Sequence, residues 1–194
     1  MLFSFNKKTK KIKIHSQTSF ASHNILERQD IEKWIESTPD ILGEDLLIIS
    51  TEYDRFDKTK ERIDLLAIDR DGNIVVIELK RDDSGKNIDL QAIKYAAYCS
   101  TMTFQDVVAI YRKYLSKKEK ISEEDTRKRI INFIQNSEFE EFSNKPRIIL
   151  VAKEFKSEVA SSVLWLRSYG LDITCVKLTP YEVDEDRIEF ESTI

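Results

Sequence analysis

Two short hydrophobic runs stand out along the chain. Residues 63–68 and 74–79 are almost continuous series of branched apolar side chains. Runs of this length and density are typical of strands that are buried on both faces of a sheet. Polar side chains interrupt or directly follow these runs at Asp64, Glu78 and Lys80. We therefore predict a buried pair of strands that carries a small polar group.

The turn between the two runs determines how these polar side chains meet. A three-residue loop at 70–72 would pair Asp69 with Asn73 and place glycine at its left-handed third position. This register puts Asp64 directly opposite Glu78, and Lys80 on the same face as Glu78. A two-residue turn at 71–72 would shift the register by one and move Asp64 to the other face. We predict the three-residue loop.

The remaining hydrophobic pattern predicts an alternation of helices and strands. Helices are expected at 25–37, 88–100, 103–115, 123–135 and 156–169, and strands at 46–51, 147–152, 171–178 and 188–191. The strand, helix and strand at 147–178 form a unit that predicts a parallel pair with a right-handed crossover. The fold class is therefore α/β, with a central mixed sheet in α-β-β-β-α-β order flanked by helices.

Size and composition favour one domain. The chain has 194 residues and a net charge of −4, so its overall charge does not indicate a nucleic-acid partner. Within one domain we expect a basic N-terminal arm or edge strand at 1–23, a core with the polar group at 24–100, and helices with closing strands at 101–194. The sequence has no signal peptide and no membrane-spanning run, so we expect a cytoplasmic protein without membrane contact.

Two carboxylates side by side on a buried sheet favour a metal ion. They repel each other and resist ionisation unless a cation lies between them. Their hard oxygen ligands indicate Mg²⁺ or Mn²⁺, and no cysteine or histidine lies near Asp64 or Glu78 in the sequence to suggest zinc. The alternative is a simple ion pair of one carboxylate with Lys80 near the end of the sheet.

These residues also resemble a known family. Asp64 followed by Glu78-Leu79-Lys80 looks like the motif of the PD-(D/E)XK nuclease superfamily, with Ile-Asp in place of Pro-Asp. The resemblance extends over residues 27–98, and this segment is similar to the catalytic domain of NucS-type endonucleases. It implies a restriction-endonuclease-like core and metal-dependent hydrolysis of phosphodiester bonds in DNA, in repair or foreign-DNA defence.

The resemblance also implies roles for single residues. Asp64 and Glu78 would bind Mg²⁺ or Mn²⁺, with the Leu79 backbone carbonyl and Glu27 as further ligands. Lys80 would orient or help to deprotonate the attacking water, so that Asp64, Glu78 and Lys80 form the catalytic group. A glutamine and a tyrosine border the active site in related nucleases, which implies substrate contacts for Gln91 and Tyr95.

Several of these roles have simpler alternatives. Glu27 lies on the inward stripe of its helix, but it would also complete a capping box with Asn24. Gln91 and Tyr95 recur at helical spacing, and a tyrosine in such a position is often a half-buried core residue. Glu52, at the end of the strand at 46–51, is a further candidate carboxylate. The charged connection at 54–61 is expected to be a solvated loop.

The densest basic cluster lies near the N-terminus. Five lysines occur within residues 7–13, after the apolar start of the chain. They suit phosphate contacts by a basic arm, but an edge strand also uses lysines to prevent unwanted pairing. The sequence leaves both interpretations open.

Other function classes have less support. A glycine-rich phosphate loop is missing, so we expect no nucleotide cofactor. A serine elbow is also missing, which argues against a serine hydrolase. The second hypothesis is a non-catalytic nucleic-acid-binding or interaction module that retains the nuclease fold. DNA is the expected partner in either case, and a homodimer is possible.

Overall fold

The computed structural model describes residues 1–54, 62–84 and 87–194. The α-helices are α1 (Glu32–Ser37), α2 (Ile88–Cys99), α3 (Phe104–Leu115), α4 (Glu123–Ile134) and α5 (Ser157–Ser168). The strands are β1 (Leu2–Phe5), β2 (Ile12–His15), β3 (Leu46–Tyr53), β4 (Ile63–Asp69), β5 (Ile74–Leu79), β6 (Arg147–Ala152), β7 (Ile173–Asp184) and β8 (Arg187–Thr193). The predicted α-β-β-β-α-β order is confirmed by α1, β3, β4, β5, α2 and β6, with α3 and α4 inserted before β6.

A mixed sheet forms the centre of the molecule. Its strands follow in the order β3-β4-β5-β6-β7-β8, and only the pairs β5–β6 and β6–β7 are parallel. The parallel pair predicted for β6 and β7 is therefore confirmed. Every residue of β4 and β5 is buried, as their continuous apolar runs predicted.

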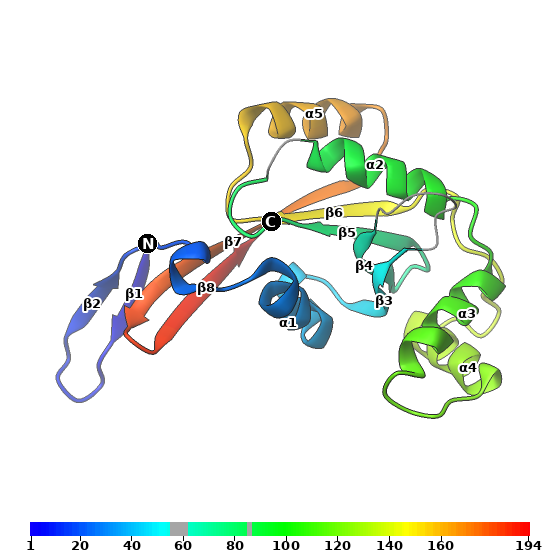
Figure 1. Cartoon of the computed structure of the whole chain (residues 1–194), viewed down its shortest axis with the longest axis horizontal. Helices are drawn as coiled ribbons and strands as arrows, with labels where there is room; N and C mark the ends of the chain where they lie inside the picture. The colour runs from blue at the N-terminus through cyan, green and yellow to red at the C-terminus, as the bar shows by residue number, and fades with distance from the viewer. Residues whose placement is uncertain (55–61, 85–86) are drawn as a thin grey trace.

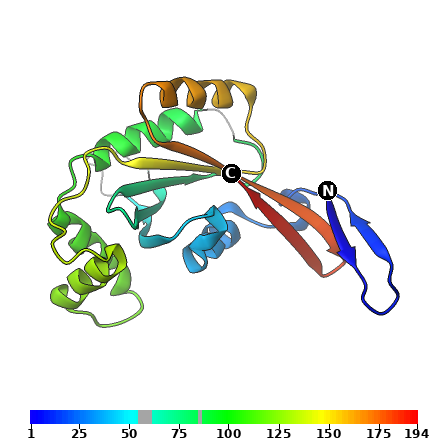
Figure 2. The ribbon, with the colours of Figure 1, turned by 180° about the vertical axis from the view of Figure 1, so that it is seen from behind.

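Helices cover this sheet on both sides. Figures 1 and 2 show α2 and α5 on one side of the sheet and α1 on the other. Helix α2 contacts β5 and β6, whereas α1 contacts β4. Helices α3 and α4 pack together beyond β3 and form a lobe at one end of the molecule (Figure 1). The strand pair β4–β5 thus lies between helical layers, where its polar side chains are shielded from bulk water.

The β4–β5 turn has the predicted geometry. The amide of Asp69 donates to the Asn73 carbonyl at 3.1 Å, and the pairs Ile68–Ile74 and Leu65–Ile77 continue the same register. Gly72 adopts a φ of +77°, the left-handed conformation that the third loop position requires. The three-residue loop is confirmed, and the two-residue alternative is wrong.

Two regions differ from the sequence prediction. The helix expected at 25–37 begins as a π-helix, η2 (Glu27–Ile31), and continues as α1. The strand expected at 171–178 is longer, because β7 and β8 form a hairpin that extends past the parallel strands towards the N-terminal hairpin β1–β2 (Figure 1). The charged connection expected at 54–61 lies outside the described residues from position 55 onward.

None of the helices in the described ranges has the length and apolar character needed to cross a membrane.

Candidate metal centre

Asp64 and Glu78 meet at the open end of the β4–β5 hairpin. The confirmed register places them opposite each other, one residue beyond the pair Leu65–Ile77. Their exposed fractions are 5% and 0%. Asp64 Oδ2 accepts a hydrogen bond from the Leu79 amide at 2.8 Å, which holds its carboxylate beside β5. The two carboxylates that were predicted to form the centre are therefore adjacent and almost completely withdrawn from water.

The Glu78 carboxylate has no hydrogen-bond partner in the part of the chain that the structure describes. Both of its oxygens are buried without a donor among the described residues. Burial, followed by repulsion from Asp64, raises the pKa of the Glu78 carboxyl far above its usual value. Burial also raises the pKa of Asp64, although the Leu79 amide partly opposes this rise. Buried carboxylates without donors are rare in native proteins, and a bound cation is one way to satisfy them.

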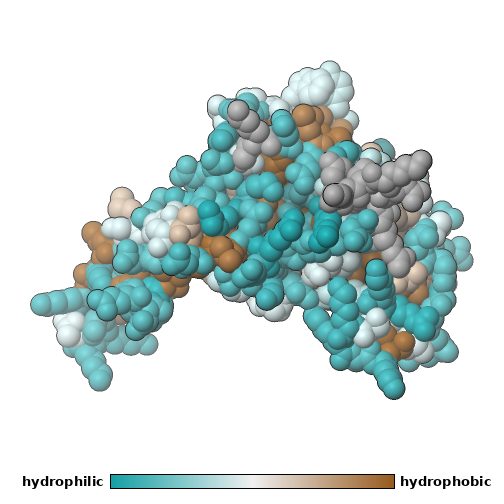
Figure 3. Space-filling model, in the orientation of Figure 1, coloured by the Kyte–Doolittle hydropathy of each residue, from teal (hydrophilic) through white to brown (hydrophobic). Residues whose placement is uncertain are grey.

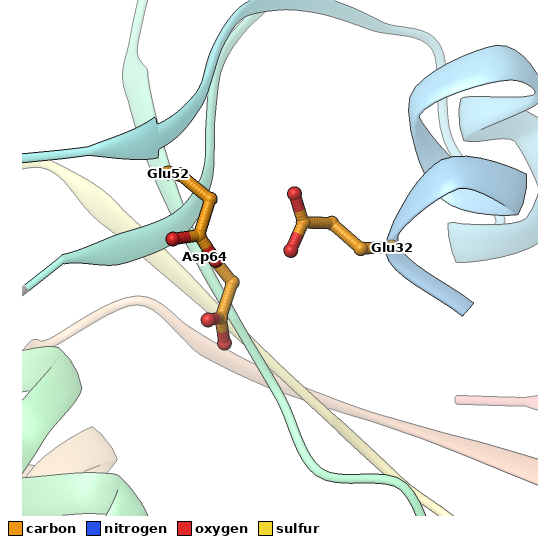
Figure 4. A group of neighbouring side chains, drawn as sticks. All are labelled: Glu32, Glu52 and Asp64. Carbon is orange, nitrogen blue, oxygen red and sulfur yellow. The ribbon is translucent and has the colours of Figure 1, made fainter. Parts of the chain in front are cut away.

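A second group of carboxylates includes Asp64. Glu32, Glu52 and Asp64 each offer one oxygen, and these oxygens lie within 4.8 Å of one another. Figure 4 shows Glu32 reaching from α1 towards Glu52 and Asp64, which come from β3 and β4. Glu32 Oε2 is buried and finds no hydrogen-bond partner among the residues that the structure describes. Burial, then Glu52 and Asp64, raise the pKa of Glu32 to about 8.

Glu32 was missed in the sequence analysis. A signal was nevertheless present, because Glu32 stands next to Ile31 and three residues before Ile35, within the buried stripe of the helix. The π-turn of η2 brings it into place: the amide of Glu32 bonds to the carbonyl of Glu27, five residues earlier. This i→i−5 pattern places Glu27 and Glu32 in successive turns on the same side of the helix. Both glutamates therefore face the same region, which an uninterrupted α-helix would not achieve.

Glu52 is held in a strained conformation. Its φ is +49°, although it is not glycine, and the register of β3 against β4 shifts between Ile48 and Ser50. Such a backbone costs about 1–3 kcal/mol and is concentrated at functional sites. The Glu52 carboxylate contacts the guanidinium groups of Arg28 and Arg62, each at 2.8 Å. The Glu52 carboxylate lies beside those of Glu32 and Asp64, so the distorted end of β3 supplies an acidic side chain to the centre.

Glu27 and Lys80 lie at the edge of the centre. Glu27 Oε2 accepts from the Arg81 amide at 2.8 Å, and its Oε1 is 3.9 Å from Lys80 Nζ. The alternative capping box is wrong, because Asn24 is in a left-handed turn before the helix, and the N-cap position is Leu26. Residues 26–29 and 80–83 line an open depression in the surface here. Lys80 is thus near the buried carboxylates and also reachable from solvent.

Gln91 and Tyr95 contact each other on α2. The Gln91 side-chain amide donates to the Tyr95 hydroxyl at 3.2 Å. Tyr95 has no exposed surface, whereas Gln91 is half-buried. In this arrangement Tyr95 orients Gln91, and only Gln91 offers surface to a substrate. The predicted substrate contacts of both residues stay predictions.

The side chains of the centre fit a hard divalent cation. Its potential ligands are carboxylate oxygens, with no cysteine or histidine among the residues of the two carboxylate groups. Oxygen donors of this kind suit Mg²⁺ and Mn²⁺. Among the described residues, four buried carboxylate oxygens are without hydrogen bonds. Glu52 Oε1 contacts the Arg28 guanidinium, whereas both oxygens of Glu78 and Oε2 of Glu32 are available as ligands. A cation would also remove the repulsion that raises the pKa values of these carboxyls.

No family model matches the chain, and neither does any curated protein. Two solved structures are similar at 20% identity over 85% of the chain: "Structure of EndoMS-dsDNA2 complex", with a TM-score of 0.41, and "crystal structure of a repair endonuclease from Pyrococcus abyssi", with a TM-score of 0.33. The chain spans about half the length of these proteins, 47% and 50%. The chemistry of this chain has to be argued from its own side chains.

Proposed function

We propose that this protein is a metal-dependent nuclease that hydrolyses phosphodiester bonds in DNA. The observation that carries the proposal is the buried Glu78 carboxylate, which lies opposite Asp64 and has no hydrogen-bond donor within residues 1–54, 62–84 and 87–194. A structural ion pair would leave neither oxygen without a partner, whereas a metal site needs free oxygens. Lys80, at the rim of the centre, supplies a cation on the side that a substrate can reach.

Asp64 is the proposed common ligand of the centre. Together with Glu78 and the Leu79 carbonyl it would hold one Mg²⁺ or Mn²⁺ ion. Glu32 and Glu52 form the second group that includes Asp64, so the carboxylates are sufficient in number for a second ion. Glu27 is the proposed ligand at the rim. A bound divalent ion supplies Lewis-acid chemistry, since it stabilises charge on the phosphate and lowers the pKa of water.

The other residues act on the substrate and the water. The Lys80 ammonium orients the attacking water, stabilises by its charge the hydroxide that forms when this water loses its proton, and offsets the negative charge on the attacked phosphate. The Gln91 amide positions the same water or a phosphate oxygen, and the buried Tyr95 hydroxyl keeps that amide in place. A role in repair or foreign-DNA defence, and a homodimeric assembly, stay predictions.

Cleavage is expected to depend on a divalent metal. Labelled single-stranded, duplex and branched DNA would be incubated with the protein in Mg²⁺, Mn²⁺ or a chelator. Products should form with metal, disappear with the chelator and return after the metal is restored. Calorimetric titration of the metal-free protein with Mn²⁺ provides an independent readout. No cleavage on any substrate, together with no Mn²⁺ binding, would favour the non-catalytic module.

Replacing Glu32 by Gln should weaken Mn²⁺ binding more than replacing Glu27. Glu32 has a buried oxygen without a partner, whereas one Glu27 oxygen already accepts from the Arg81 amide. We expect Glu32→Gln to lower the affinity by about 10–100-fold. Because the pKa of Glu32 is raised to about 8, protons compete with the metal at neutral pH. Wild-type affinity should therefore increase between pH 6.5 and 8.5 by a larger factor than in Glu32→Gln. Wild-type Mn²⁺ affinity in Glu32→Gln at both pH values would exclude Glu32 as a ligand.

A further inference from the structure

The N-terminal hairpin presents an exposed apolar face. Strands β1 and β2 pair with Phe3 opposite Ile14 and Phe5 opposite Ile12, so these four side chains share one face. Their exposed fractions are 55% for each phenylalanine, 62% for Ile14 and 68% for Ile12. Figure 3 shows hydrophobic surface among hydrophilic atoms at the end of the molecule that this hairpin forms. Large apolar patches of this kind usually mark a binding surface.

The opposite face of the β1–β2 hairpin packs on the β7–β8 hairpin. The His15 ring is buried and contacts the Glu182 carbonyl at 3.2 Å and the Ser4 hydroxyl at 2.8 Å. The Lys13 ammonium donates to the Val183 carbonyl at 2.9 Å. These contacts fix which face of the hairpin is turned outward. The exposed position of the phenylalanines is therefore a property of the folded chain.

The charge of the hairpin has one sign. Residues 1–15 contain five lysines and no acidic residue. Lys7, Lys8, Lys10 and Lys11 lie at the turn and are exposed, and in the described part of the chain none of them forms an ion pair. The Lys10 ammonium lies 5.9 Å from the centre of the Phe5 ring. Positive charge and exposed aromatic rings are therefore combined on one small element.

We propose that this hairpin is a platform for single-stranded nucleic acid, an inference that rests on the proposed nuclease function. Exposed aromatic rings stack on unpaired bases, and neighbouring lysines contact the phosphates. Phe3 and Phe5 are two residues apart on one strand, or about 7 Å, which allows successive unstacked bases to contact one ring each. Ile12 and Ile14 extend the apolar surface beside the two phenylalanine rings.

The composition of the patch favours nucleic acid over a protein partner. Lysine is depleted in protein–protein interfaces, where arginine supplies most of the positive charge. The hairpin carries five lysines and no arginine. The positive charge of the hairpin complements a phosphate backbone. The whole chain has a net charge of −4, so the hairpin differs in sign from the rest of the protein. A second copy of the chain is the competing occupant.

The test is binding of fluorescent oligo(dT) and oligo(U) to the full chain, measured by anisotropy with a chelator present to prevent turnover. Exchanging both phenylalanines for leucine keeps the apolar face but removes the rings, and should weaken binding by roughly tenfold or more. The matched variant Phe3→Tyr with Phe5→Tyr should bind like the wild type. Exchanging the four turn lysines for glutamine should reduce the salt dependence, with a change in slope of about 3.

Two results would overturn the platform. The first is that the double leucine variant, the double tyrosine variant and the wild type bind the oligonucleotides with equal affinity. The other is a dimer in sedimentation that dissociates when Ile12 and Ile14 become serine, with oligonucleotide binding unchanged; this face would then belong to a second copy. The Asp64→Asn variant separates the two proposals, because it should bind oligonucleotide normally without cleaving it. If the wild type bound the oligonucleotides but did not cleave DNA in the presence of metal, the proposed nuclease function would be wrong and the hairpin platform would stand.

Discussion

Glu78→Gln is expected to abolish metal binding and DNA cleavage while making the metal-free protein more stable. The exchange removes a direct ligand, so Mn²⁺ affinity should fall by more than about 100-fold, and cleavage should fall to background. Stability should change in the opposite direction, because the variant no longer buries an ionisable group without hydrogen-bond donors. Few ordinary core substitutions would combine these two effects.

The stability gain has a defined dependence on pH. Burial and Asp64 raise the pKa of Glu78 above its ordinary value of 4.5, so the folded protein holds a proton that the unfolded chain releases. The free energy of unfolding of the wild type therefore decreases as pH rises from 4.5 towards the folded pKa. An amide does not ionise, so the stability of Glu78→Gln relative to the wild type should rise by about 1.4 kcal/mol for each pH unit between pH 5 and pH 8.

Thermal unfolding at both pH values, with and without Mn²⁺, measures these effects. Mn²⁺ should raise the unfolding temperature of the wild type and leave that of Glu78→Gln unchanged. The control is Glu138→Gln, which removes an exposed carboxylate and should alter neither stability nor activity. If Glu78→Gln retained metal-dependent cleavage, or lost stability at pH 8, the role of Glu78 in the centre would be wrong.

The part of the centre that the sequence predicted depends on local geometry. The register of a hairpin follows from its turn, and the turn follows from the position of Gly72, so the pairing of Asp64 with Glu78 could be predicted from adjacent residues. The continuous apolar runs likewise predicted strands buried on both faces. In both cases the information lies within about twenty residues of sequence.

Glu32 was missed, and Glu52 was named only as a further candidate, because their places in the centre depend on departures from regular geometry. The π-turn of η2 shifts Glu32 into line with Glu27, and the positive φ of Glu52 redirects a strand residue. Periodicity assumes uniform helices and strands, so neither shift is visible in the sequence pattern. Such irregularities are stabilised by the surrounding tertiary structure, and they often occur where a ligand has to be bound. The extension of β7 to Asp184 was missed because it runs through Pro180, and proline within an apolar run normally argues against a central strand. Strand β8 was expected to be shorter because its residues are mostly exposed and show no buried pattern.

Lys80→Met is expected to separate turnover from metal binding. Methionine keeps most of the length of the side chain but removes its charge and its donors. If Lys80 orients and helps to deprotonate the attacking water, kcat should fall by about 10²–10⁴-fold. Mn²⁺ affinity should stay the same or increase, because a positive charge near Asp64 and Glu78 has been removed. Glu78→Gln, in contrast, should lose both properties.

The measurement for Lys80 combines single-turnover cleavage with calorimetric titration of Mn²⁺. Lys33→Met serves as the matched control, because Lys33 is exposed on α1 and lies outside the centre. Loss of Mn²⁺ binding in Lys80→Met would show that the lysine supports the fold of the site rather than the chemistry. Wild-type kcat in this variant would remove Lys80 from the catalytic group. A low kcat with intact metal binding would instead assign to Lys80 a step in catalysis that the carboxylates cannot perform, since they carry no positive charge to place beside the phosphate.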